Sequence, residues 1–221
     1  MWGSLFGGQG SSDDGRPDAL RFPALAATRA YWEALRSAQG TAIPDRTRID
    51  PRGIGGALDW ALIADPVAPG GARFRLAGSV ICDLMGMDVR GMPVLSLIEP
   101  HARAALAEAV ETVLTAPAIL TLSLEAERGI GRPALEGRML MLPLRRVNGE
   151  AGLALGCLAL DGQIGRAPRR FAIARRLVEP LAPLPALEGM AEPASPYAPP
   201  RPAAGRPHLR LVHGGAGPRV G

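Results

Sequence analysis

The sequence predicts an α+β domain built from antiparallel hairpins and amphipathic helices. Two turn signals, Pro69-Gly70-Gly71 and Asn148-Gly149, lie between apolar runs, and each predicts a β-hairpin. Apolar residues also recur at helical spacing over residues 26–39 and 99–115. With 221 residues and 47% hydrophobic content, the chain is long enough for one domain with a core of its own.

The first element that the pattern predicts is a helix over residues 26–39. Its apolar residues share one face and are Ala27, Tyr31, Leu35 and Ala38, with Trp32 beside them. Gly40 follows and ends the helix. Residues 1–25 begin with a stretch rich in Gly, Ser and Asp, and we expect this N-terminus to be flexible.

A hairpin and two helices are predicted next. After a short helix from Pro51 to about Leu58, residues 60–65 form an apolar run typical of a buried strand. In the second strand, Phe74 and Leu76 alternate with arginines, so we expect both to face the core. A short helix over residues 79–86 and a longer helix over 99–115 follow. The apolar face of the longer helix holds Ala102, Leu106, Ala109, Val110 and Val113.

Three more strands complete the predicted sheet, over residues 120–127, 137–147 and 151–160. The first alternates apolar and polar residues most clearly. After Asp161-Gly162 the pattern weakens, and residues 163–180 are predicted to hold a short Arg-rich helix. The Pro- and Gly-rich residues 181–221 form a tail that we expect to be disordered. Its segment 208–213 has strand character, which leaves open a frayed end or a strand added to a sheet edge.

Charge, cysteine content and hydropathy indicate the cellular compartment and the kinds of partner to expect. All 25 basic residues are Arg, and residues 145–221 hold 11 of them against 5 acidic residues. Cys82 and Cys157 lack the spacing of a zinc site or a redox pair, so we expect buried, reduced thiols. No signal peptide pattern and no stretch long enough to span a bilayer is found. We therefore expect a cytoplasmic protein with no membrane partner.

Several short segments, in their order and spacing, resemble a known family. They are Tyr31-Trp32-Glu33-Ala34-Leu35-Arg36, Pro44-Asp45-Arg46 with Ile49-Asp50-Pro51, and Phe74-Arg75-Leu76-Ala77-Gly78 with Gly86-Met87-Asp88-Val89-Arg90-Gly91. This set is similar to the alphaproteobacterial PAS domain family, in a group where the PAS module stands almost alone. The resemblance covers residues 26–162. It implies a PAS-like fold, with a five-stranded antiparallel sheet, helices on one face of it, and residues 26–39 as the N-terminal flanking helix.

The resemblance further implies a non-enzymatic sensory or regulatory module. Such a module binds a small ligand or a partner protein in or near a cavity between sheet and helices, and relays its state by protein contact to a signalling protein. The residues expected to line this cavity are Phe74, Leu76, Ile81, Leu84, Met85, Leu106, Val110, Met139, Met141 and Leu155. The cofactor is left unknown. The Asn-Cys-Arg-Phe motif of flavin-binding photoreceptors is missing, and His101 projects away from Leu106, so we do not expect it to bind haem.

Two other functions are left open, together with the oligomeric state. The chain is alternatively an adaptor or scaffold that binds no ligand, or a nucleic-acid binder that uses its arginines. The arginines considered are Arg145, Arg146, Arg169, Arg170, Arg175 and Arg176, which show no stripe with aromatic residues. No catalytic or metal-ligating pattern stands out. The stripe of Tyr31, Trp32 and Leu35 is a candidate homodimer interface, because such a helix must cover its own sheet or a second copy.

Overall fold

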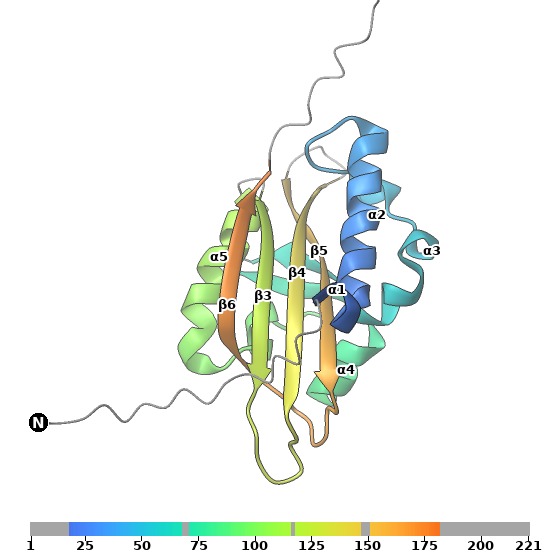
Figure 1. The fold of residues 1–221 in the computed structure, drawn as a ribbon. Helices are drawn as coiled ribbons and strands as arrows, with labels where there is room; N and C mark the ends of the chain where they lie inside the picture. Colours follow the sequence, from blue (N-terminus) through green and yellow to red (C-terminus); the bar gives the residue numbers. More distant parts are fainter. Residues whose placement is uncertain (1–17, 68–70, 116–117, 147–150, 182–221) are drawn as a thin grey trace, which may run out of the picture. The chain divides into compact units, whose positions relative to one another are not determined.

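The computed structural model describes residues 18–67, 71–115, 118–146 and 151–181 (Figure 1). All of them lie in the first of two units, Met1–Leu184 and Pro185–Gly221. The predicted tail after residue 181, with its segment 208–213, therefore lies outside the described residues. Within the described part of the chain, no helix combines the length and hydropathy needed to cross a membrane.

A six-stranded antiparallel sheet forms the centre of the fold (Figure 1). Its strands are β1 (Ala61–Pro66), β2 (Ala72–Ala77), β3 (Ala118–Ala126), β4 (Leu135–Arg145), β5 (Ala151–Gly162) and β6 (Phe171–Pro180). Their order across the sheet is β2-β1-β5-β4-β3-β6, and every neighbouring pair is antiparallel. The α+β class and the five predicted strands are confirmed, and a sixth strand is added at the β3 edge.

The helices follow the predicted order. They are α1 (Asp18–Arg21), α2 (Pro23–Gln39), α3 (Pro51–Ile54), α4 (Ser79–Met85) and α5 (Arg103–Thr115). Short 3₁₀ helices lie between them, among them η2 (Gly55–Trp60) and η4 (Pro100–Ala102). Pro23 opens α2 at its first turn, where its missing N–H costs no hydrogen bond. Gly40 ends α2 with a φ of 60°, a conformation that glycine adopts without strain.

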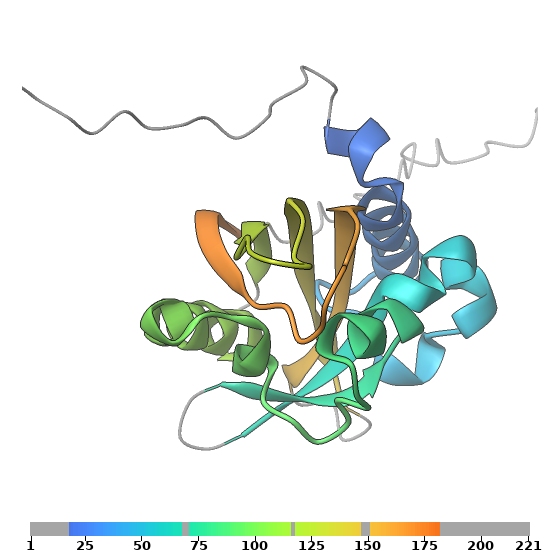
Figure 2. The same ribbon diagram turned by 90° about the horizontal axis from the view of Figure 1, so that it is seen from below.

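Helices cover both faces of the sheet, so the expectation of one covered face is wrong. Figure 2 shows α4 and α5 on one side of β3, β4 and β6 and α2 on the other. The reason lies in β4, where Met139 and Met141 face α5 while Leu140 and Leu142 face α2, so both faces are apolar and need cover. We call these two layers the inner core, beneath α4 and α5, and the outer core, beneath α2.

The sequence prediction of a helix over residues 163–180 is wrong, because β6 occupies most of this segment and pairs with β3. The register shifts between Ser123 and Leu124, which leaves Ala174 as an extra residue in β6. This bulge interrupts the alternation that identifies a strand, and Ala and Arg favour helix in isolation. The folded part therefore extends past residue 162.

The N-terminal boundary also differs from the prediction. Residues 18–25 were expected to be flexible, but they form α1 and the start of α2. Phe22 is 1% exposed in the outer core. Arg21 holds Asp161 and Glu136, on β5 and β4, at 2.6 and 3.0 Å. One buried aromatic ring and one paired guanidinium thus fix this segment to the sheet.

Candidate functional site

Eight of the ten candidate pocket residues lie together in the inner core. They are Phe74, Ile81, Leu84, Met85, Leu106, Val110, Met139 and Met141, and each is at most 6% exposed. The predicted faces of α4 and α5 therefore point toward the sheet. Two pockets of about 180 Å³ lie elsewhere in the domain, and neither is lined by any of these eight side chains. These residues act in the structure as close-packed core.

The other two candidates, Leu76 and Leu155, lie on the opposite face of the sheet. Ile63 pairs with Leu76 and Ala64 pairs with Phe74, so Arg75 is an extra residue in β2. This bulge turns Leu76 away from the face of Phe74, and Leu76 is 52% exposed. The prediction that both residues face the core is therefore wrong for Leu76. Leu155 belongs to the outer core because β5 presents its odd-numbered leucines there.

Leu76 and Leu155 meet again in a cleft of about 180 Å³, which we call the apolar cleft. Its walls come from α3, η2, β1, β2 and β5, with further residues from their connections. The lining residues are Ile49, Pro51, Ile54, Leu58, Ala61, Leu62, Ile63, Leu76, Ala77, Gly78 and Leu155. Leu58 and Leu76 are 47% and 52% exposed, so the cleft opens to solvent between two large apolar side chains.

Local sequence features hold the walls of the apolar cleft in place. Asp50 caps α3 by accepting a hydrogen bond from the Arg52 amide at 2.9 Å, and Pro51 starts the helix. A Cβ at Gly78 would lie 2.2 Å from the carbonyl oxygen of Asp59, so glycine lets η2 approach the end of β2. The residues contributed by α3 and η2 were missed from sequence. Ile54 and Leu58 are four residues apart, which is the signal that could have identified them.

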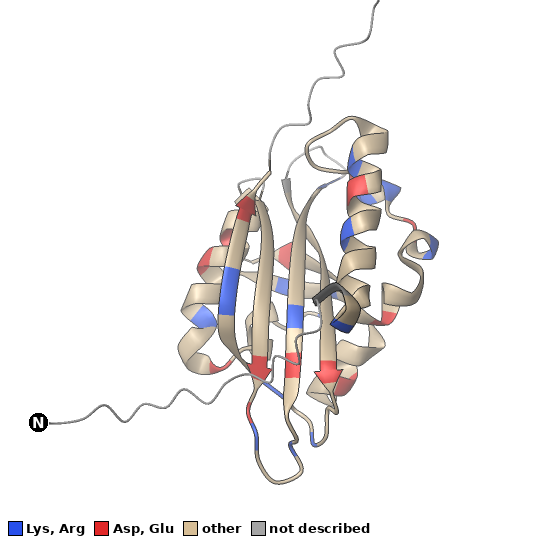
Figure 3. Ribbon diagram, viewed as in Figure 1, with Lys and Arg blue, Asp and Glu red and all other residues tan. Residues whose placement is uncertain are grey.

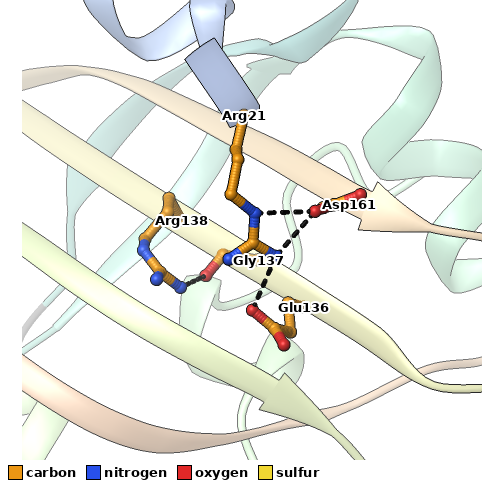
Figure 4. A network of polar contacts seen from close by, with 5 residues as sticks. All are labelled: Arg21, Glu136, Gly137, Arg138 and Asp161. Carbon is orange, nitrogen blue, oxygen red and sulfur yellow. Dashed lines mark hydrogen bonds and ion pairs between the residues drawn. The ribbon is translucent and has the colours of Figure 1, made fainter. Parts of the chain in front are cut away.

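A second pocket, also about 180 Å³, lies between the start of α2 and strands β3 and β4. It is lined by Phe22, Leu25, Ala26, Arg29, Thr121, Arg138 and Leu140. Figure 4 shows the polar network beside it, in which Arg21 donates to Asp161 and Glu136, and Arg138 donates to the carbonyl oxygen of Gly137. The guanidinium of Arg138 lies 4.9 Å from the centre of the Phe22 ring.

This network balances its charges internally. The pKa of Arg21 is raised, with the hydrogen bond to Asp161 as the largest cause, partly opposed by desolvation and supported by Glu136. Arg29 likewise pairs with Glu179 of β6 at 3.0 Å. These ion pairs join the N-terminal helices to both halves of the sheet, so we assign them a structural role.

The cysteines and His101 offer little chemistry. Burial raises the pKa of the Cys157 thiol to about 11, so it is protonated at neutral pH, and Cys82 is half-buried. His101 lies in η4 with a 71% exposed side chain, 3.4 Å from Glu99. Among the described residues, no three or more His, Cys, Asp or Glu side chains are grouped so that they could hold a metal ion.

The six arginines considered for phosphate binding do not form one surface. Arg145 donates to the carbonyl oxygen of Ile43, and Arg176 donates to that of Ala105. Arg169 is 1% exposed, because its guanidinium is enclosed by backbone carbonyl groups. The structure instead places Arg128, Arg132 and Arg166 at one end of the sheet, a grouping between two loops that local sequence patterns do not reveal.

A comparison with protein families relates the chain to a known type of domain. Residues 20–159 match the PAS domain family. No curated protein matches the chain. A solved structure described as an RNA-binding Light-Oxygen-Voltage receptor is 20% identical, with a TM-score of 0.36 over 70% of this chain and 36% of that one, so this chain spans about a third of that receptor. Since the family match covers more than half of the sequence, the chain belongs to the PAS domain family.

Proposed function

We propose that this PAS domain is a non-enzymatic sensory or regulatory module that relays its state to a signalling protein by direct contact at the apolar cleft. The observation that carries the proposal is the position of Leu58 and Leu76, two large apolar side chains about half exposed at the mouth of a preformed cleft. Apolar side chains that line a concave surface are a common basis of protein recognition. Membership of the alphaproteobacterial group is part of the same proposal.

The volume of the cleft favours a protein side chain over a large cofactor. Sites for drug-sized ligands span roughly 300–1,000 Å³. A cavity of roughly 150 Å³ holds a benzene-sized group. The apolar cleft, at about 180 Å³, thus matches one large apolar side chain of a partner.

A shared wall connects the cleft to the inner core. Leu62 is 1% exposed and belongs to the inner core, and it also lines the cleft. Ala77 likewise touches both. A small ligand that rearranged the inner core would therefore move residues that a partner contacts, since close-packed side chains transmit displacement. This is the physical route by which we propose that the state of the module reaches its partner.

Photo-crosslinking in the native host tests the contact. A photoreactive phenylalanine analogue is placed at Leu76, and in a second protein at Leu177, which is 44% exposed on β6 and serves as the control. We expect a discrete crosslinked protein from position 76 only. The crosslink should disappear when Leu58→Asp is added, because a carboxylate at the mouth would have to be desolvated on binding. A crosslink that survives Leu58→Asp, or that position 177 gives equally, contradicts the proposal.

Native mass spectrometry of the protein from its own host separates a ligand-dependent module from a ligand-free adaptor. A stoichiometric mass added to the chain identifies the ligand-dependent form. We expect such a mass to be lost in Leu106→Phe, because a larger side chain in the close-packed inner core hinders the rearrangement that a ligand would require. A chain that carries no added mass and still gives the crosslink from position 76 would indicate a ligand-free adaptor.

A further inference from the structure

Two loops at one end of the sheet form a joint surface that presents an apolar tip. One is the β3–β4 connection, residues 127–134, and the other is the β5–β6 connection, residues 163–170 (Figure 3). We call them together the basic tip. Ile130, at the point of the first loop, is 99% exposed. Isolated exposed apolar residues are common on protein surfaces. Exposure alone therefore does not mark Ile130 as a contact residue, and its surroundings must also point to a function.

The turn that carries Ile130 does not require isoleucine. Gly129 and Arg132 exchange two backbone hydrogen bonds of 2.9 and 3.0 Å, which close a two-residue turn at Ile130 and Gly131. Gly131 has a φ of 71°, so the glycine is needed, whereas the first turn position has negative φ and accepts ordinary residues. Ile130 therefore serves neither the turn nor the core. Its side chain is available for contact with another molecule.

The loop is held rigidly despite its exposure. Arg169, 1% exposed, donates from its guanidinium to the carbonyl oxygens of Glu127 and Pro133 at 2.9 and 2.8 Å, and to that of Ile164. The amide of Arg166 donates to the Gly131 carbonyl oxygen at 2.7 Å. Side chain and backbone thus fix both loops to each other. A preordered tip loses little conformational freedom when it binds.

Arginines surround Ile130 in the basic tip. The two loops contain five arginines and one acidic residue, a net charge of +4. Arg128, Arg166 and Arg170 are exposed, and Arg132 pairs with the single acid, Glu127, at 3.3 Å. Glu125 is also exposed at the adjoining end of β3. Of the acids on β4 and β5 nearby, Glu136 and Asp161 are held by Arg21. Within the two loops the exposed charge is thus predominantly positive, with acidic residues at the strand ends beside them (Figure 3).

We propose that the basic tip is a peripheral docking surface for an anionic lipid membrane. Ile130 would enter the boundary between headgroups and acyl chains, while the arginines reach lipid phosphates around it. The shape favours a membrane over an acidic protein, because a single projecting side chain between glycines suits a soft, flat surface and offers little area for a shape-matched protein interface. The sequence-based expectation of no membrane partner considered only spanning segments. This inference goes beyond the proposed function and does not depend on it.

Vesicle co-sedimentation of the full chain tests the proposal. The probes are vesicles of phosphatidylcholine alone and of phosphatidylcholine mixed with phosphatidylglycerol. We expect binding to the anionic vesicles only, and we expect it to weaken as salt is raised. Ile130→Ser should reduce it severalfold, and Arg128→Gln and Arg166→Gln should each reduce it about fivefold, since a basic residue near an anionic surface contributes about 1 kcal/mol. The matched controls are Leu177→Ser and Arg52→Gln, which are exposed elsewhere and should bind like the unmodified chain.

Two results overturn the proposal. One is a chain that binds neither kind of vesicle at low salt; a protein crosslink obtained from a photoreactive group at position 130 would then identify an acidic protein as the partner. The other is binding that the tip variants leave unchanged, which would assign the attraction to arginines outside the basic tip. Thermal unfolding of Ile130→Ser should match that of the unmodified chain, so a change in binding cannot be traced to lost structure.

Discussion

One buried residue, Arg169, joins three segments that are distant in sequence. Its amide donates to the Leu84 carbonyl oxygen at 2.9 Å, and its side chain holds the carbonyl groups of Glu127, Pro133 and Ile164. Desolvation lowers the pKa of this guanidinium, with a further effect from Arg132. Removing this cation would leave the buried carbonyl groups that accept its hydrogen bonds without a donor.

We predict that Arg169→Met destabilises the fold by about 2–4 kcal/mol, because buried carbonyl groups lose their donors. Urea unfolding measures the change. Arg170→Met, at the exposed neighbouring position, is the control and should stay within about 0.5 kcal/mol of the unmodified chain. Equal effects of the two substitutions would mean that the carbonyl groups find other donors, and the interpretation of Arg169 as the joining residue would be wrong.

The buried thiol of Cys157 predicts a pH dependence of stability. Its pKa is raised from 9.0 to about 11 in the folded protein, mainly by burial, with a smaller opposing effect of Thr28. The folded state therefore keeps a proton that the unfolded state releases. The contribution is fully present below pH 9 and is lost as the pH rises to 11, a decrease of about 2–3 kcal/mol.

Urea unfolding at pH 8 and pH 10.5 measures this decrease. Cys157→Ala is the control, since it removes the titrating group and should lose stability less steeply over the same interval. Parallel pH profiles for the two proteins would assign the dependence to other groups. Cys82, which is half-buried, remains in both proteins and cancels in the comparison.

At the scale of an element, α5 is the helix whose buried face the sequence predicted well. Leu106 is 0% exposed in the inner core. We predict that Leu106→Ala costs about 2–5 kcal/mol, through lost burial and a residual cavity. Glu111→Ala on the exposed face is the control and should be nearly neutral. Thermal unfolding checks both, and an unchanged transition for Leu106→Ala would contradict this assignment of the helix face.

Strands β2 and β6 mark the limit of prediction from local pattern. Both contain a bulge, at Arg75 and Ala174 respectively, and each bulge shifts the alternation by one residue. The sequence therefore pointed Leu76 to the wrong face and assigned β6 to a helix. A bulge is set by pairing with a neighbouring strand, which periodicity within one segment does not contain. Strand β3 has no such interruption on its β4 side, and its alternation was predicted correctly.

At the scale of the whole molecule, the sequence predicted the class of fold and most of the inner core, but not the cleft. Eight candidate residues are neighbours in space because they belong to one buried layer, which apolar patterning reports directly. The cleft lies where α3 and η2 meet three strands, so its existence depends on tertiary contacts. Leu76 and Leu155 were chosen as pocket residues for the inner face and line a different cavity on the outer one.

The structure reduces the candidate dimer interface on α2, because the fold buries one of its three residues. Trp32 is 0% exposed and donates to the Pro143 carbonyl oxygen at 3.0 Å, so its inclusion in a dimer interface is wrong. The Tyr31 hydroxyl accepts a hydrogen bond from the Asp50 amide at 2.7 Å and thereby supports α3. Leu35 remains half-buried on α2. Helix α2 covers its own sheet. The surface that remains as a candidate for self-association is smaller and lies around Leu35.

Homodimer formation stays a prediction, now with a narrower test. Because the remaining apolar surface is small, we expect weak association, with a sedimentation coefficient that rises with protein concentration. Leu35→Glu should keep the chain folded and remove the rise, since a pair of facing carboxylates would have to be desolvated. Ser37→Glu, at an exposed position of the same helix, is the matched control and should still associate. A chain that sediments as a monomer at every concentration removes the dimer, and the half-exposed surface of α2 would then be free for a different protein.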